Sequence, residues 1–362
     1  MLSTPSNTAK KPHRGALENP TGRFEALEAT YDPNPDWAAE PGEEVFEETL
    51  KTRFYKDASR NVLTHNNSPD IGFDFSINPY RGCEHGCIYC YARPTHEYLG
   101  MSAGLDFESK ILVKTDAPAL LRKALLAKKW KPQVIVMSGV TDCYQPAERH
   151  FKITRQCLEV LAEFRNPVGI ITKNHLVTRD VDVLSELAQY NAIRVMVSIT
   201  TLDDSLVSKM EPRTSRPIMR LKAIEALSNA GVSTGVMMGP IIPGLTDHEV
   251  DSVLRHAADA GAQTASHTLV RLPYGVKDLF SQWLETHFPD RKNRVLNRLR
   301  DMHNGELNDN RFGKRMSGEG HYADYINAMF DMAKKRYGLK GRSKPLSSEH
   351  FRTNGSQQLS LF

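Results

Sequence analysis

The chain has 362 residues, of which 40% are hydrophobic and 25% are charged, and this is the composition of a folded globular protein. Its formal net charge of +4 is too small to indicate a polyanionic partner by itself. The N-terminal stretch has no apolar core of a secretory signal, and no apolar run is long enough to cross a membrane, so we expect no membrane association. Five cysteines, three of them within eight positions, are not typical of a disulfide framework, and we therefore expect a protein of the reducing cytoplasm.

The first segment, residues 1–60, is rich in Pro, Gly, Ser and Asn and carries an acidic stretch from Asp32 to Glu48. Such a segment buries too little apolar surface to offset the chain entropy that folding removes. We therefore expect a poorly ordered N-terminal arm, with a local docking segment around Trp37 and Phe46.

From about residue 72, apolar and β-branched runs alternate with amphipathic stretches. The runs predict strands at 73–78, 110–114, 133–139, 168–173, 193–200, 233–241 and 266–272. Helical patterns lie between them at 118–128, 147–164, 181–189, 220–230 and 247–260. Near-continuous apolar strands indicate a parallel sheet that is buried on both faces, with helices as crossovers. Repeated βα units of this size predict an α/β barrel or an open partial barrel over residues 61–275.

The C-terminal part of the chain changes in character. The pattern of residues 276–340 predicts a helical extension. This extension is basic, because residues 291–342 include 13 Lys or Arg and only 6 Asp or Glu. The last segment, 341–362, is polar until its apolar end, and we expect it to be a disordered tail.

Three cysteines carry the strongest chemical signal. Cys83, Cys87 and Cys90 are spaced C-x3-C-x2-C directly after the first predicted barrel strand. Three thiolates in one loop can ligate three irons of a 4Fe–4S cube and leave the fourth iron open for a substrate amine and carboxylate. The alternative is a structural zinc site with His85 or His96 as fourth ligand, but such sites usually have a second pair of ligands, which is absent here.

This loop, with an aromatic residue before its last cysteine, resembles that of radical S-adenosylmethionine (radical SAM) enzymes, and the resemblance extends over about residues 72 to 275. CIYCYA and SITTLDDSLVSKMEPR resemble the spore photoproduct lyase-like branch and its uncharacterised bacterial relatives. The resemblance implies a partial (βα)6 TIM-type barrel that uses a 4Fe–4S cluster to cleave S-adenosylmethionine into a 5′-deoxyadenosyl radical. It also implies an electron donor such as flavodoxin or ferredoxin.

Four residues are candidates for binding S-adenosylmethionine. Lys173 ends a predicted strand and supplies a cation for the carboxylate, and Asp142 substitutes for the Gly-Gly-Glu motif that many members use for the amine. Ser198 matches a strand-end residue that contacts the ribose region, and the fixed place of Tyr89 between two cluster cysteines puts its ring near the adenine. The alternative is that strand-end Lys, Asp and Ser cap the following helices or face solvent.

Two further residues, Glu211 and Arg213, lie in the sequence EPR. They are expected either to form a salt bridge that orders the site or to bind the cofactor, and the structural role is favoured.

The hydrogen-atom donor is less well defined. Photoproduct lyases use a cysteine in the region of the third strand, and the matching position here is Gly139. Cys143 follows nearby and is either a replacement donor or a buried structural cysteine. Tyr91, beside the last cluster cysteine, matches a tyrosine of that branch. Both Cys143 and Tyr91 are therefore candidate catalytic residues.

The end of the chain points to a partner. The residues Gln358, Leu359, Ser360, Leu361 and Phe362 resemble the pentapeptide by which bacterial DNA polymerases and repair factors dock on the sliding clamp. Together with the basic extension, this makes nucleic acid the leading substrate class, and the first hypothesis is a lyase-like repair reaction on DNA. A modification of tRNA or a protein side chain is the first alternative. A metal-binding scaffold that binds DNA or the clamp without catalysis is the second.

Overall fold

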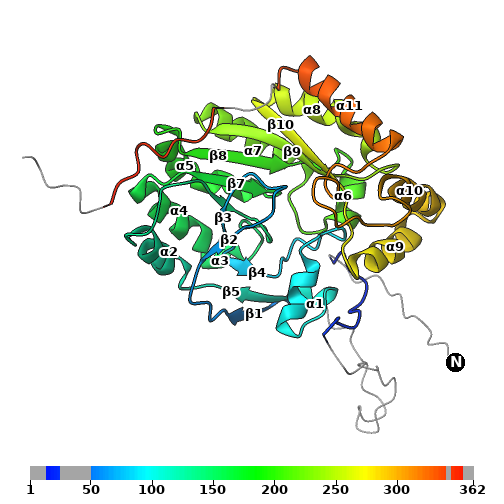
Figure 1. Cartoon of the computed structure of the whole chain (residues 1–362), viewed down its shortest axis with the longest axis horizontal. Coiled ribbons are helices and arrows are strands. Elements are labelled where there is room, and N and C mark those ends of the chain that lie inside the picture. The colour runs from blue at the N-terminus through cyan, green and yellow to red at the C-terminus, as the bar shows by residue number, and fades with distance from the viewer. Residues whose placement is uncertain (1–13, 25–49, 340–343, 354–362) are drawn as a thin grey trace, which may run out of the picture.

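The computed structural model describes residues 14–24, 50–339 and 344–353. Its centre is a seven-stranded sheet in the order β10-β9-β8-β7-β6-β3-β2, in which all neighbours except β3 and β2 run parallel (Figure 1). The strands are β2 (Leu63–His65), β3 (Phe75–Ile77), β6 (Ile135–Met137), β7 (Val168–Thr172), β8 (Ile193–Ser198), β9 (Ser233–Ile241) and β10 (Thr264–Leu269).

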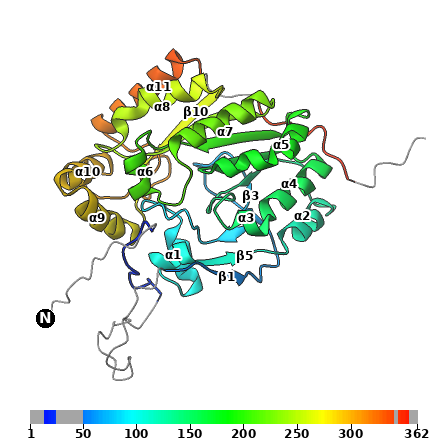
Figure 2. The same ribbon diagram turned by 180° about the vertical axis from the view of Figure 1, so that it is seen from behind.

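Helices follow the parallel strands and lie outside the sheet, as the two opposite views show (Figures 1 and 2). They are α2 (Ala117–Leu125), α3 (Glu148–Phe151), α4 (Ile153–Phe164), α5 (Val181–Ala188), α6 (Asp204–Met210), α7 (Pro217–Asn229) and α8 (Val250–Asp259). The core between sheet and helices is made of aliphatic side chains such as Ile135, Val195 and Leu254, none of which is exposed. Six parallel strands with this covering form the partial (βα)6 barrel that the sequence predicts.

One predicted strand does not belong to the barrel. The segment 110–114 forms β5 (Lys110–Val113), which lies between β1 (Arg53–Lys56) and β4 (Tyr80–Arg81) in a separate three-stranded sheet. β5 pairs parallel to β1 and antiparallel to β4. Periodicity identifies β5 as a strand, but its partners come from segments that the sequence gives no reason to place beside it.

Parts of both expected tails pack on the barrel. In the N-terminal arm, Ala16 is fully buried and residues 53–56 form β1. In the C-terminal tail, Phe351 packs against Phe164, and Arg352 donates to the carbonyl of Glu163 at 2.9 Å. The arm and the tail are therefore ordered in these stretches, because a few anchors are fixed by long-range contacts. The docking segment expected around Trp37 and Phe46 and the clamp-like peptide 358–362 lie outside the described residues.

The C-terminal extension is helical, as expected, with α9 (Val276–His287), α10 (Pro289–Met302) and α11 (His321–Arg336). The first two helices share a hydrophobic cluster with Ile88 and Tyr89 of the cysteine loop, and Trp283 of α9 is its largest fully buried side chain. The extension thus covers one side of that loop. No helix in the described part of the chain is long and apolar enough to cross a membrane.

Candidate radical SAM site

The three cysteines of the motif open onto one cavity of about 750 Å³. They lie in the loop between β4 and the short 3-10 helix η1 (Arg93–Leu99), and none of them forms a disulfide. The cavity is also lined by residues at the carboxyl ends of β6, β7, β8 and β9, among them Asp142, Lys173, Ser198 and Gly239. Because the carboxyl ends of parallel strands meet at one edge, residues far apart in the sequence converge on these thiols.

A buried ion pair shapes the cysteine loop from behind. Arg93 is fully buried and donates to the carbonyls of Gly86 at 3.2 Å and Cys87 at 3.0 Å, and its Nη2 lies 2.5 Å from Oε1 of Glu108. Glu108 in turn accepts hydrogen bonds from the backbone of residues 15 and 16. The guanidinium of Arg93 thus binds the loop carbonyls, and the carboxylate of Glu108 neutralises its charge. These contacts fix the loop before any metal binds.

The N-terminal segment and the cysteine loop pack closely against each other, and each has a glycine at the contact, Gly15 and Gly86. Gly86 has a φ of 66°, a conformation that L side chains rarely adopt. A Cβ on Gly15 would lie only 1.7 Å from the carbonyl oxygen of Gly86. The segment at 14–16 therefore packs directly on the backbone of the cysteine loop, and no other residue fits at position 15.

The thiols suit a cluster better than a single zinc ion. Burial raises the pKa of Cys83, Cys87 and Cys90, so the thiols are protonated unless a metal replaces the proton. Of the two histidines considered as a fourth ligand, Nδ1 of His85 lies 3.4 Å from Asp142, and Nε2 of His96 lies 2.9 Å from the carbonyl of Lys110. Nδ1 of His96 has no hydrogen-bond partner among the described residues, but His96 is not among the residues that line the cavity. A set of three sulfur donors beside an open cavity fits the three protein-bound irons of a 4Fe–4S cluster.

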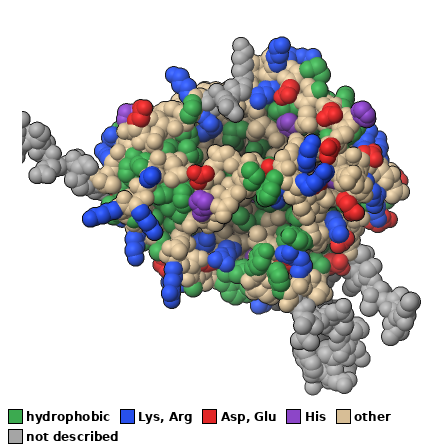
Figure 3. Space-filling model, in the orientation of Figure 1, with side chains coloured by type: hydrophobic (Ala, Val, Ile, Leu, Met, Phe, Trp, Pro, Cys, Tyr) green, Lys and Arg blue, Asp and Glu red, His purple; other side chains and the backbone are tan. Residues whose placement is uncertain are grey.

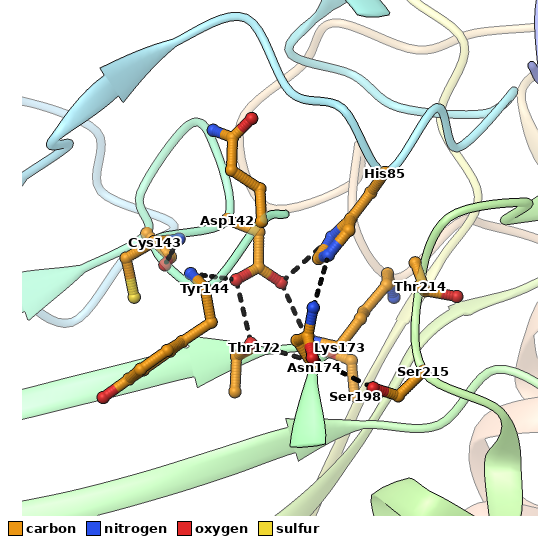
Figure 4. Close-up of polar contacts among 12 residues, drawn as sticks. His85, Asp142, Cys143, Tyr144, Thr172, Lys173, Asn174, Ser198, Thr214 and Ser215 are labelled. Carbon is orange, nitrogen blue, oxygen red and sulfur yellow. Dashed lines mark hydrogen bonds and ion pairs between the residues drawn. The ribbon is translucent and has the colours of Figure 1, made fainter. Parts of the chain in front are cut away.

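Asp142 ties together the loops around the cavity (Figure 4). Its Oδ1 accepts from Thr172 Oγ1 and from the backbone N–H of Tyr144, both at 2.8 Å. Its Oδ2 accepts from the backbone N–H of Lys173 at 2.7 Å and faces His85. Burial opposes ionisation, but His85 and these N–H donors together lower the pKa of Asp142. The carboxylate therefore orders the strand ends, and its contact with the cofactor amine stays a prediction.

Lys173 and Glu211 belong to a second polar group. Nζ of Lys173 donates to the carbonyl of Gly239 at 2.8 Å and lies 3.6 Å from Oε1 of Glu211. Glu211 also forms a fully buried ion pair with Arg220 and accepts from the Tyr89 hydroxyl. Burial opposes ionisation here too, but Arg220 and Lys173 lower the pKa of Glu211 well below its usual range.

The ion pair expected between Glu211 and Arg213 is not formed. Arg213 instead lies 2.9 Å from Oε1 of Glu84, next to the first cluster cysteine. Glu211 does form an ion pair, but its partner is Arg220 of the following helix, α7. Arg220 also donates to the carbonyl of Ser198, so its side chain lies at the carboxyl end of β8.

The other predicted site residues fall into two groups. Ser198 and Tyr91 line the cavity, and the Tyr91 hydroxyl donates to the carbonyl of Gly139 at 2.8 Å. Cys143 is fully buried and is not among the residues that line the cavity. Its sulfur lies on the side of Asp142 away from His85 (Figure 4). The geometry thus brings Tyr91, and not Cys143, to the space beside the cluster cysteines.

Several residues at the site were not found from the sequence. Arg93 and Glu108 hold the cysteine loop, and Arg271 and Arg315 line the cavity. Arg93 directly follows the cysteine motif in CYARP, which is a local signal. The others have none, because their role depends on contacts between distant segments.

Comparisons with known proteins agree with this site. The family model described as "Radical SAM superfamily" matches residues 77–257, which is half of the chain. The uncharacterized protein Rv2578c of Mycobacterium tuberculosis is 34% identical over 239 residues, covering 66% of this chain and 69% of that protein. The uncharacterized protein MJ0683 of Methanocaldococcus jannaschii is 32% identical over 178 residues, covering 49% and 64%.

Among solved structures, spore photoproduct lyase complexed with dinucleoside spore photoproduct has the same fold, with a TM-score of 0.55 and 15% identity, covering 78% of this chain and 79% of that one. A cysteine-to-serine mutant of the same enzyme gives a TM-score of 0.54 at 16% identity, covering 78% and 79%. The superfamily uses a 4Fe–4S cluster and S-adenosylmethionine, which agrees with the donor set around the cavity. From its family match, its relatives and its fold, this chain belongs to the radical SAM superfamily.

Proposed function

We propose that Cys83, Cys87 and Cys90 ligate three irons of a 4Fe–4S cluster, and that the enzyme reductively cleaves S-adenosylmethionine bound beside it to a 5′-deoxyadenosyl radical. The observation that carries the proposal is the opening of all three thiols onto a cavity that also contains the strand-end polar groups. The cluster supplies the electron for the cleavage, received from a donor such as flavodoxin or ferredoxin, and the protein binds, orients and shields the reactants.

The residues around the cavity have separate roles in this proposal. Lys173 provides the cation for the carboxylate of the cofactor, and Glu211 and Arg220 hold that lysine and Tyr89 in place. Asp142 and Ser198 provide acceptors at neighbouring strand ends. Arg93 keeps the carbonyls of the cysteine loop turned away from the cavity by binding them on the buried side.

We propose DNA as the substrate, in a lyase-like repair reaction. The support is the shared fold with spore photoproduct lyase, which is described in complex with a dinucleoside photoproduct. In this proposal Tyr91 takes part in hydrogen transfer, and its support is that the Tyr91 side chain lines the cavity beside Cys90. The clamp-like peptide at 358–362 adds a second, independent link to DNA metabolism.

Anaerobic reconstitution tests the cofactor part of this proposal. The expected result is about four irons per chain and formation of 5′-deoxyadenosine that requires a reductant. Replacing Cys83, Cys87 or Cys90 with Ala removes both, whereas Cys157→Ala, a buried cysteine of α4, retains them. About one zinc per chain, with no cleavage, would establish the scaffold alternative instead.

Substrate stimulation tests the DNA part separately. Ultraviolet-irradiated DNA is expected to raise the rate of 5′-deoxyadenosine formation and to be repaired, as measured by loss of photoproducts in digested DNA. Unirradiated DNA, tRNA and a peptide library serve as comparisons. Stimulation by tRNA or peptide alone would assign the same radical chemistry to another substrate.

The proposed clamp contact has its own test. Deleting residues 358–362 is expected to abolish co-elution with a bacterial sliding clamp while leaving 5′-deoxyadenosine formation unchanged. Equal co-elution of the full-length and shortened chains would refute a clamp-binding role for this peptide.

A further inference from the structure

Three Lys and Arg side chains line the cavity, namely Lys173, Arg271 and Arg315. Lys173 lies beside Glu211, and Arg315 forms an ion pair with Asp70 and donates to Ser68. Arg271 differs from both. Among the residues that the structure describes, no carboxylate lies within ion-pair distance of its guanidinium and no hydrogen bond engages it.

The position of Arg271 is nevertheless well defined. It follows β10, whose last residue, Leu269, donates its backbone N–H to the carbonyl of Met316 at 2.8 Å. The guanidinium lies 4.8 Å from the ring centroid of Tyr91, and the Tyr91 hydroxyl is fixed on the carbonyl of Gly139. Stacking on a ring leaves the N–H edges of a guanidinium free to bind two oxygens of an anion.

The ionisable groups that act on Arg271 are Tyr91, Arg315, Asp70 and Cys90. The one carboxylate among them, Asp70, is already paired with Arg315. Burial lowers the pKa of Arg271, yet an arginine remains charged in the physiological range. This half-buried cation has no direct ion-pair partner among the described residues, and an incoming anion would supply one.

Two cations thus flank the last cluster cysteine on different sides. Lys173 lies over the Tyr89 ring, which faces Thr200 and Glu211, whereas Arg271 lies over the Tyr91 ring, which faces Gly139 at the end of β6. The first position belongs to the proposed cofactor site. The second is left for another reactant.

Tyr91 favours a nucleotide as that reactant. Its side chain is 46% exposed although it lines the cavity, so part of the ring is open to a ligand. An open aromatic ring next to an unpaired guanidinium offers a stacking surface for a base and a fork for the adjoining phosphate. On the outer face shown in Figure 3, Lys and Arg side chains are scattered and do not gather in one patch, so local contacts in the cavity matter more than a basic surface.

We propose that Arg271 binds a backbone phosphate of the nucleic-acid substrate and so positions the nucleotide beside Tyr91. The inference rests on the proposed nucleic-acid function and adds to it the residue that recognises the phosphodiester. Arg271 acts here as a binding and specificity residue. The hydrogen transfer itself is left to other groups.

The test compares Arg271→Gln and Arg271→Lys with Arg300→Gln, an equal charge change on the exposed face of α10. Each anaerobically reconstituted protein is titrated with a fluorescent single-stranded oligothymidylate and with the same oligomer carrying a neutral methylphosphonate backbone. Arg271→Gln is expected to weaken binding of the phosphodiester probe by about ten- to a hundredfold, with Arg271→Lys between it and the unchanged chain. The neutral probe should bind the unchanged chain and Arg271→Gln equally.

A second probe, thymidine 5′-monophosphate, separates the anion site from the nucleic-acid function. If the unchanged chain binds the monophosphate and Arg271→Gln does not, the anion site stands even when the oligomer fails to bind. Equal binding by Arg271→Gln and Arg300→Gln, or tighter binding of an acidic peptide than of either phosphate probe, would overturn the proposal. Absence of 5′-deoxyadenosine from the unchanged chain would refute the proposed radical chemistry and leave this binding result intact.

Discussion

Asp70 and Arg315 form an ion pair between segments that are 245 positions apart in the chain. Asp70 lies in the loop between β2 and β3, at one edge of the seven-stranded sheet, and also accepts from the backbone N–H of Gly313 at 2.6 Å. The segment that contains Arg315 is hydrogen-bonded to β10, at the other edge. The ion pair therefore joins segments at the two edges of the partial barrel, and both of its residues line the cavity.

Breaking this link is expected to destabilise the partial barrel. The side chains of Asp70 and Arg315 are only 9% and 18% exposed, so Asp70→Asn leaves a largely buried guanidinium without its charge partner. We expect Asp70→Asn and Arg315→Gln each to lower the free energy of unfolding by about 1–3 kcal/mol. Urea denaturation of the two single variants and the double variant measures the coupling. Strictly additive losses would contradict a direct link between the two residues.

The contact between Gly15 and Gly86 predicts a strict requirement at position 15. Gly15→Ala places a methyl group where the carbonyl of Gly86 lies, so the cysteine loop or the N-terminal segment must move, at a cost of about 1–3 kcal/mol. We expect faster iron loss from the reconstituted protein on exposure to a chelator. Gly275→Ala is the matched control because nothing lies within 4 Å of its Cβ position. Equal iron loss from both variants would show that the segment is not needed to hold the loop.

The buried ion pair of Glu211 and Arg220 predicts that a nearly isosteric substitution of Glu211 strongly lowers the free energy of unfolding. Neither side chain is exposed, so Glu211→Gln keeps the shape but leaves the guanidinium of Arg220 uncompensated, which costs about 3–5 kcal/mol. Glu225→Gln, on the exposed face of α7, is the control and should change stability by less than about 0.5 kcal/mol. Thermal and urea unfolding give both values. A loss below about 1 kcal/mol for Glu211→Gln would mean that other groups compensate Arg220.

His96 predicts a dependence of stability on pH. Burial lowers its pKa in the folded protein to about 4, below the ordinary value of about 6.5 in the unfolded chain. The unfolded state therefore takes up a proton first, and stability is lost as the pH falls from about 6.5 toward about 4. The full loss is about 3 kcal/mol, and His96→Gln should remove this part of the slope. Urea unfolding of the cluster-free protein at several pH values checks it, and an unchanged slope in His96→Gln would assign the effect to other groups.

The sequence by itself determined those features of the protein that depend on residues close together in the chain. The cysteine motif, with three cysteines within eight positions, and the regular apolar runs can be recognised in the sequence. Both features depend on residues that are close together in the chain. They predicted the barrel, the cysteine loop and the strand-end positions of Lys173 and Ser198. The same pattern also placed the strand at 110–114 in the barrel, whereas β3 pairs directly with β6 and β5 belongs to the separate sheet.

Tertiary structure decided which distant groups meet. The partner of Glu211 is Arg220 and not Arg213, β5 pairs outside the barrel, and Cys143 is turned away from the cavity that Arg271 faces. Such contacts depend on where the helices and loops pack relative to the strand ends. The sequence around one member of an ion pair does not indicate which residue is its partner. For that reason the sequence predicts which residues ligate the metal, whereas the residues that hold the loop, join the barrel edges and line the cavity on the side of Tyr91 emerge only from the folded chain.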